Sequence, residues 1–247
     1  MARDLQAEDV IDPRNTPPIN PLPPVVWLLA LPMIGLEAVL SLADRGLVGG
    51  AGAVGWRSQM LSRLAFSPDY WRQSLANATL DGAGLLRLVS YPFVHGSAGH
   101  ALFAVVLLLA LGKFVAEVFR LWGVLVVFFV AAVTGALAMA AVPAAHQALY
   151  GAYAGVYGLI GAFTWLVWMR LAGSGVSQFR AFTMIGILLV GQLIFGVLTT
   201  VLNIGQGLLG VDWSWIADLA GFAAGFVVSF VVSPGGWARV LARVRAR

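Results

Sequence analysis

The stretch Gly151–Ala162 reads GAYAGVYGLIGA and opens an apolar segment that continues to about Met169. Glycines recur in this stretch at three- and four-residue spacing, at Gly151, Gly155, Gly158 and Gly161. In a soluble helix each such glycine would cost about 1 kcal/mol relative to alanine. In a membrane helix the same spacing leaves one face almost bare, so that a neighbouring backbone can approach closely. The stretch therefore predicts a tightly packed transmembrane helix.

The composition of the whole chain indicates a membrane protein. Of its 247 residues 60% are hydrophobic and 11% are charged, and the mean hydropathy is +0.88. A soluble domain has about 25% charged residues. The chain has no cysteine, which excludes a disulfide framework and thiolate chemistry. The net charge is +4, but the basic residues lie between apolar segments and form no stripe for nucleic acid.

Six apolar segments predict an all-α, polytopic bundle of six transmembrane helices. Each has about the 20 residues that a membrane-spanning helix needs. They are Val25–Leu42, Ala98–Phe114, Leu121–Val142, Tyr150–Met169, Phe182–Leu202 and Trp215–Val232. We therefore expect a single membrane domain over residues 25–234. A polar, proline-rich tail over residues 1–24 precedes it, and a basic tail over residues 235–247 follows it.

The first segment and the long loop after it carry two further signals. Glu37 lies inside the first segment, where a charged carboxylate facing lipid costs several kcal/mol, so it should face the bundle or a neighbour. The loop Ala43–Leu85 contains apolar residues near helical spacing, namely Trp56, Met60, Leu61 and Leu64. This pattern predicts an amphipathic helix that lies in the membrane interface.

The distribution of basic residues predicts the orientation in the membrane. With the N-terminus inside, ten of the 15 Lys and Arg residues fall on the cytoplasmic side, and the other five fall on the outer side between the first and second segments. An excess of Lys and Arg marks the cytoplasmic loops. We therefore expect a multi-pass protein of a bacterial inner (plasma) membrane with both termini in the cytoplasm.

The amino-acid sequence of Gly151–Ala162 resembles that of the fourth transmembrane helix of rhomboid intramembrane proteases. The run Val156–Ala162 matches the family motif in its aromatic, apolar and glycine positions. The residues before it depart from the motif, because Ala154 stands at a glycine position and Tyr153 stands at the position of the nucleophilic serine. The resemblance thus covers the residues of the motif that pack the helix, and it does not cover the residues that include the catalytic serine.

Two other stretches resemble the same family. Around His95 and His100 the chain is similar to the rhomboid oxyanion region, in which a histidine and an asparagine four residues later bind the developing oxyanion. Here His100 matches the histidine, but Ala104 replaces the asparagine. In the sixth segment Gly221 and Gly225 keep the family's small-residue packing face. Asp218 stands there at the position of the general-base histidine.

The replaced pair predicts that serine-type proteolysis is absent from these positions. The reference pKa values of Tyr and Asp are about 10 and about 3.9, so proton transfer from Tyr153 to Asp218 faces about 8 kcal/mol. Tyrosine is also bulky and would fill the space for a peptide bond. We expect instead that Tyr153 donates a hydrogen bond to Asp218, because the corresponding positions touch in rhomboids.

The histidines predict neither a metal site nor a cofactor. His95, His100 and His146 all fall on the outer side, but a five-residue spacing does not place two ligands on one helix face. No cysteine or carboxylate clusters with them. A histidine that hydrogen-bonds the first loop is the simpler expectation.

The resemblance covers about residues 70–234 and implies a rhomboid-like protein whose Ser–His dyad is replaced. Inactive members of this group bind membrane-spanning clients, so the resemblance implies that this chain binds a transmembrane client helix. One alternative is an active rhomboid-type serine endopeptidase with displaced catalytic residues. The other is a transporter or channel, in which Glu37, Gln192 and Asp218 would form a proton or ion path.

Overall fold

The computed structural model describes residues 21–172, 174–201, 212–236 and 245, and the regular elements in these ranges are helices joined by turns and loops. The long helices are α1 (Pro24–Asp44), α5 (Ala98–Ala116), α6 (Leu121–Ala140), α7 (Tyr153–Leu171), α8 (Thr183–Val201) and α9 (Ser214–Val232). The short ones are η2 (Gly50–Ala53), α2 (Trp56–Leu64), α3 (Pro68–Ala76), α4 (Gly82–Ser90), η3 (Tyr91–Phe93) and η4 (Gln178–Phe182). The predicted all-α fold is confirmed.

Local signals explain where several helices begin. α1 begins with Pro24 in its first turn, where the missing N–H would have no intrahelical partner anyway. The hydroxyl of Ser97 precedes α5 and accepts a hydrogen bond from His100 N. Ser67 and Asp81 cap α3 and α4 in the same way. Each cap satisfies one of the free N–H groups at a helix start.

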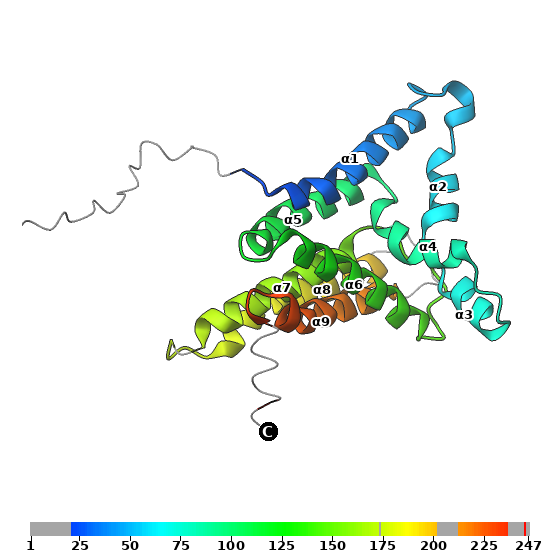
Figure 1. The fold of residues 1–247 in the computed structure, drawn as a ribbon. Helices are drawn as coiled ribbons and strands as arrows, with labels where there is room; N and C mark the ends of the chain where they lie inside the picture. The colour runs from blue at the N-terminus through cyan, green and yellow to red at the C-terminus, as the bar shows by residue number, and fades with distance from the viewer. Residues whose placement is uncertain (1–20, 173, 202–211, 237–244, 246–247) are drawn as a thin grey trace, which may run out of the picture.

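Helix α7 lies at the centre of the bundle. It packs against α5, α6 and α9, and α1 packs on the outer side of α5 (Figure 1). Eleven residues of α7 are buried, including its consecutive run Ala154–Ala162. Successive long helices alternate in direction, so the start of α7 lies at the same end of the bundle as the starts of α5 and α9. We call this the α7 N-terminal end.

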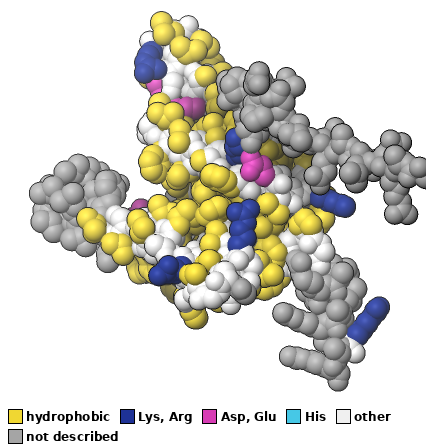
Figure 2. Space-filling view, turned by 90° about the vertical axis from the view of Figure 1, so that its left-hand side faces the viewer, with side chains coloured by type: hydrophobic (Ala, Val, Ile, Leu, Met, Phe, Trp, Pro, Cys, Tyr) yellow, Lys and Arg dark blue, Asp and Glu magenta, His cyan; other side chains and the backbone are white. Residues whose placement is uncertain are grey.

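Among the residues that the structure describes, five helices are long and apolar enough to cross a membrane, namely α1, α5, α6, α7 and α9. Figure 2 shows hydrophobic side chains spread over much of the described surface on one face, with few charged ones between them. Most of the fifth predicted segment, Phe182–Leu202, forms α8, whereas Leu202 lies outside the described residues. A sixth crossing therefore stays a prediction, as do the domain boundaries, which fall partly in residues that the structure does not describe.

The long first loop is folded rather than extended. It contains η2, α2, α3 and the start of α4, and of these the sequence predicted only the helix near Trp56–Leu64. Arg72 of α3 ties the loop to the end of α6, because its guanidinium donates to the carbonyl oxygens of Ala140, Val142 and Ala145. The location of α2 in the membrane interface remains a prediction.

Candidate functional site

Tyr153 is the first residue of α7, and its side chain contacts α5. Its hydroxyl donates a hydrogen bond to the carbonyl oxygen of His100 at 3.3 Å. Its ring stacks on the His100 ring with 4.9 Å between centroids and 19° between planes. The Tyr150 ring meets His100 edge-on at 5.8 Å. The half-buried His100 imidazole thus lies against two tyrosine rings.

His95 is almost fully buried beside His100, with 1% of its surface exposed. The two rings meet edge to face at 5.4 Å. Both ring nitrogens of His95 are buried, and neither has a hydrogen-bond partner in the described chain. Burial lowers the pKa of His95 to about 4, because the charged imidazolium loses its hydration. His95 is therefore neutral at physiological pH.

A charged network joins the first loop to α1 and to the His95 backbone. The Arg57 guanidinium of α2 donates to both carboxylate oxygens of Glu37, at 2.8 and 2.9 Å. It also donates to Asp44 at 2.8 Å and to the His95 carbonyl at 3.0 Å. The hydrogen bonds with Glu37 raise the pKa of Arg57 above its ordinary value, so it stays charged. Ser41 donates to Glu37 as well, at 2.7 Å.

The structure thus places Glu37 against a neighbour, as the sequence predicted. The identity of that neighbour was missed, because the sequence alone named no partner for Glu37. A buried carboxylate inside an apolar segment is itself the signal that a cation lies nearby. The sequence contains four arginines in the loop Ala43–Leu85, however, and only the folded loop selects Arg57.

Asp218 lies in α9 and is bonded to α8 rather than to α7. The Gln192 amide donates a hydrogen bond to the Asp218 carboxylate at 2.8 Å. Only 5% of the Asp218 surface is exposed. Among the described residues no hydrogen bond joins Tyr153 to Asp218, so the predicted bond between them is wrong. Tyr153 points instead to the start of α5, where the backbone carbonyl of His100 accepts a hydrogen bond from its hydroxyl.

The amide oxygen of Gln192 is a second unusual feature of this pair. It is buried and has no hydrogen-bond partner in the described part of the chain. An unpaired polar atom away from water costs free energy that a donor would recover. The Gln192–Asp218 pair therefore contains a buried acceptor, the amide oxygen of Gln192, that accepts no hydrogen bond from the described residues.

The glycines of the motif lie at close contacts between helices. A methyl group on Gly155 would stand 2.5 Å from the Phe128 ring. On Gly158, Gly161, Gly221 and Gly225 it would collide with Ala131, Phe222, Ala154 and Gly158, respectively. Gly151 has φ +92°, and a methyl group there would stand 2.7 Å from the His100 ring. The last contact explains why the turn before Tyr153 carries a residue without a side chain.

The described residues contain no group of three or more His, Cys, Asp or Glu side chains that could hold a metal ion. His146 lies apart from the other two histidines and pairs with Asp69 at 3.0 Å. Ala104 is fully buried in α5 and offers no side-chain donor. The candidate site at the α7 N-terminal end therefore consists of His95, His100, Tyr153, the Arg57 network and the Gln192–Asp218 pair.

These apolar helices, with their polar groups turned inward, define an integral, multi-pass membrane protein. The model of the rhomboid domain matches residues 82–235, which is more than half of the chain. The chain therefore belongs to the rhomboid family. A comparison with curated proteins gave no match.

Proposed function

We propose that this rhomboid-family protein lacks the Ser–His dyad and binds a transmembrane client helix instead of cleaving it. The observation that carries the proposal is the Gln192–Asp218 pair. Asp218 stands at the family's general-base position and accepts its hydrogen bond from Gln192 of α8. A carboxylate engaged in this way is not directed at a nucleophile.

The surroundings of Tyr153 support the absence of serine-type chemistry. Its ring occupies the space beside His100, and its hydroxyl is bonded to a backbone carbonyl. The nearest serine in the chain to His100 is Ser97, whose hydroxyl accepts a bond from the His100 backbone N–H and not from its ring. Among the described residues no serine hydroxyl is hydrogen-bonded to a histidine ring.

The attachment of α8 supports a client site beside it. The first half of α8 packs on the core through Ile185, Leu188 and Leu189. Beyond this region the bond from Gln192 to Asp218 joins α8 to α9. The unpaired amide oxygen of Gln192 lies at the same point. A client helix that carries a hydroxyl or amide donor in mid-membrane would satisfy this acceptor.

Photo-crosslinking tests this proposal in the native membrane. A photoreactive phenylalanine derivative replaces Tyr153 in one variant and the lipid-exposed Leu31 of α1 in a control variant. We expect a membrane-spanning protein to be crosslinked from position 153 and not from position 31. Q192L should reduce the crosslink, because it removes the amide that holds Asp218 and offers the acceptor. Equal crosslinking from both positions would contradict a client site at Tyr153.

A fluorophosphonate probe, run in parallel on the unmodified protein, tests the protease alternative. Such probes label an activated serine. No labelling and no cleavage of a rhomboid substrate in detergent is the expected result. Labelling of any serine would show that the catalytic residues have been displaced within the chain, and it would overturn the proposal.

Transport is the weaker alternative because its polar residues are not connected. Glu37 is bonded to Arg57 and Ser41, whereas Asp218 is bonded to Gln192. No hydrogen bond between described residues joins these two groups. Proton flux into liposomes that contain the purified protein would favour transport over client binding.

A further inference from the structure

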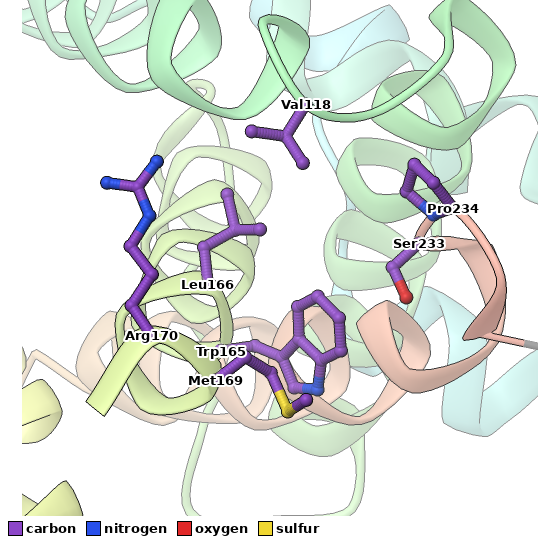
Figure 3. Close-up of a pocket in the computed structure, with 7 residues that line it drawn as sticks. All are labelled: Val118, Trp165, Leu166, Met169, Arg170, Ser233 and Pro234. Atoms are coloured by element: carbon purple, nitrogen blue, oxygen red, sulfur yellow. The ribbon is translucent and has the colours of Figure 1, made fainter. Parts of the chain in front are cut away.

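A hollow of about 300 Å³ lies at the end of the bundle opposite to the His95 and Tyr153 site. It is bounded by the C-terminal turns of α7 and α9 and by the turn between α5 and α6 (Figure 3). Its walls are formed by Val118, Trp165, Leu166 and Met169, with Arg170 and Ser233 as polar members. None of these residues takes part in the proposed client site.

The walls of the hollow are apolar and continue into the membrane-spanning part of α7. Trp165 is 4% exposed, and its indole ring meets the rings of Phe119 and Phe230 edge-on. It therefore forms the buried base of the hollow. Met169 is 39% exposed and Val118 is 36% exposed. Apolar surface of this kind at the end of a spanning helix contacts the part of the lipid acyl chains that lies next to the headgroups.

Arg170 supplies a positive charge at the edge of the hollow. It lies in the last turn of α7, and Figure 3 shows its side chain extending from α7 beside Leu166. Its guanidinium is exposed and has no hydrogen bond or ion pair with any described residue. A guanidinium binds phosphate oxygens with two parallel hydrogen bonds.

The same end of the described bundle has an excess of positive charge. Its cations are Lys113, Arg120, Arg170 and Arg180, against the carboxylate of Glu117. Clustered Lys and Arg at a membrane surface attract anionic lipid, with about 1 kcal/mol per residue. A headgroup with net negative charge therefore suits this end better than a zwitterionic one.

From this cavity and its charge we propose that the hollow binds one anionic phospholipid of the adjacent leaflet. Its phosphate pairs with the Arg170 guanidinium. The first methylenes of its acyl chains lie against Leu166, Met169 and Val118. The site is independent of the client site, because the two lie at opposite ends of α7.

Native mass spectrometry of the full chain in detergent, titrated with dioleoyl phosphatidylglycerol, tests the proposal. We expect one tightly bound phosphatidylglycerol per chain and at least tenfold weaker binding of dioleoyl phosphatidylcholine. R170Q should weaken phosphatidylglycerol binding about tenfold. The matched control R180Q removes the same charge from the exposed η4 at the same end, and it should change the affinity less than twofold.

A second variant separates a built site from general charge attraction. M169W keeps Arg170 but fills the hollow, and it should also weaken phosphatidylglycerol binding. Inorganic phosphate should not compete, because it has no acyl chains for the apolar walls. Equal effects of R170Q and R180Q, unchanged binding by M169W, or full competition by phosphate would each overturn the proposal.

Discussion

At the scale of single residues, Arg57 is the group on which the first loop depends. Its side chain is 13% exposed and that of Glu37 is 11% exposed, so their pair is largely withdrawn from water. It connects α2, α1 and the backbone before α5 in one network. Loss of one member leaves the other charge without a partner in a poorly hydrated place.

R57Q should therefore lower the free energy of unfolding by about 3 kcal/mol, because it leaves Glu37 uncompensated. Thermal unfolding of the purified protein in detergent measures this loss. R63Q is the matched control, since Arg63 lies on the same helix and is exposed. The double variant E37Q/R57Q should be less destabilised than the sum of the single variants. An R57Q variant as stable as R63Q would contradict the role of the network.

The burial of His95 predicts that the stability of the protein depends on pH. Its folded-state pKa of about 4 lies below the ordinary value of 6.5, so the unfolded chain binds the proton first as the pH falls. The stability that comes from a neutral His95 is complete above pH 6.5. It decreases between pH 6.5 and about 4, by about 3 kcal/mol in all. Glu37, Arg57 and His100 are the ionisable groups that influence it there.

H95F should flatten the decrease in the unfolding midpoint between pH 6.5 and 4. At pH 7.5 it should leave stability unchanged or raise it, because neither His95 nitrogen has a partner to lose. Thermal unfolding at a series of pH values measures both effects. A variant with the same acid sensitivity as the wild type would show that another group is responsible.

At the scale of elements, the contact between α7 and α9 is the closest in the bundle. Gly158 of α7 faces Gly225 of α9, and Gly221 faces the Ala154 carbonyl. Backbones in such close contact gain packing energy that larger side chains would prevent. The position of Asp218 in the site is set by this contact, because Asp218 precedes Gly221 by one helical turn.

G225A should destabilise the protein by about 2 kcal/mol, because its methyl group would overlap the Gly158 carbonyl oxygen. Thermal unfolding in detergent is again the measurement. G35A in α1 is the control, since no atom lies within 4 Å of a methyl group there. Similar losses in the two variants would indicate a general effect of glycine replacement and no special contact at Gly225.

At the scale of the whole molecule, the alternation of the helices predicts which loops share a side of the membrane. Ala148 lies between α6 and α7, and Asp212 lies just before α9, so both belong to the α7 N-terminal end. Ser174 lies after α7, at the opposite end. The chain has no cysteine, so single cysteines at these positions report sidedness without background.

In whole cells, A148C and D212C should react with a membrane-impermeant maleimide, and S174C should react only after permeabilisation. This result would establish that α8 crosses the membrane and that the Lys113 and Arg170 side is cytoplasmic. Labelling of S174C and D212C from the same side would contradict a crossing by α8. Reversed labelling of all three would leave the crossings intact but overturn the predicted orientation.

The sequence by itself determined the class, the approximate segments and the family. Hydrophobic segments of about 20 residues must be helical in a bilayer, because no other local structure satisfies their backbone groups. The glycine spacing of Gly151–Ala162 likewise marks α7 before any contact is known. Hydrophobicity and glycine spacing are properties of short stretches, so they can be recognised without knowing the tertiary contacts.

Only the tertiary structure decided the partners of the polar side chains. Glu37 needed a cation, but several arginines in the first loop were available, and the fold of that loop chose Arg57. The sequence predicted that Tyr153 would meet Asp218. In the structure the Tyr153 ring stacks on His100 and its hydroxyl is hydrogen-bonded to α5, whereas the Asp218 carboxylate accepts its hydrogen bond from Gln192. The physical reason is that a hydrogen bond depends on ångström distances between distant segments, which packing sets and local spacing does not.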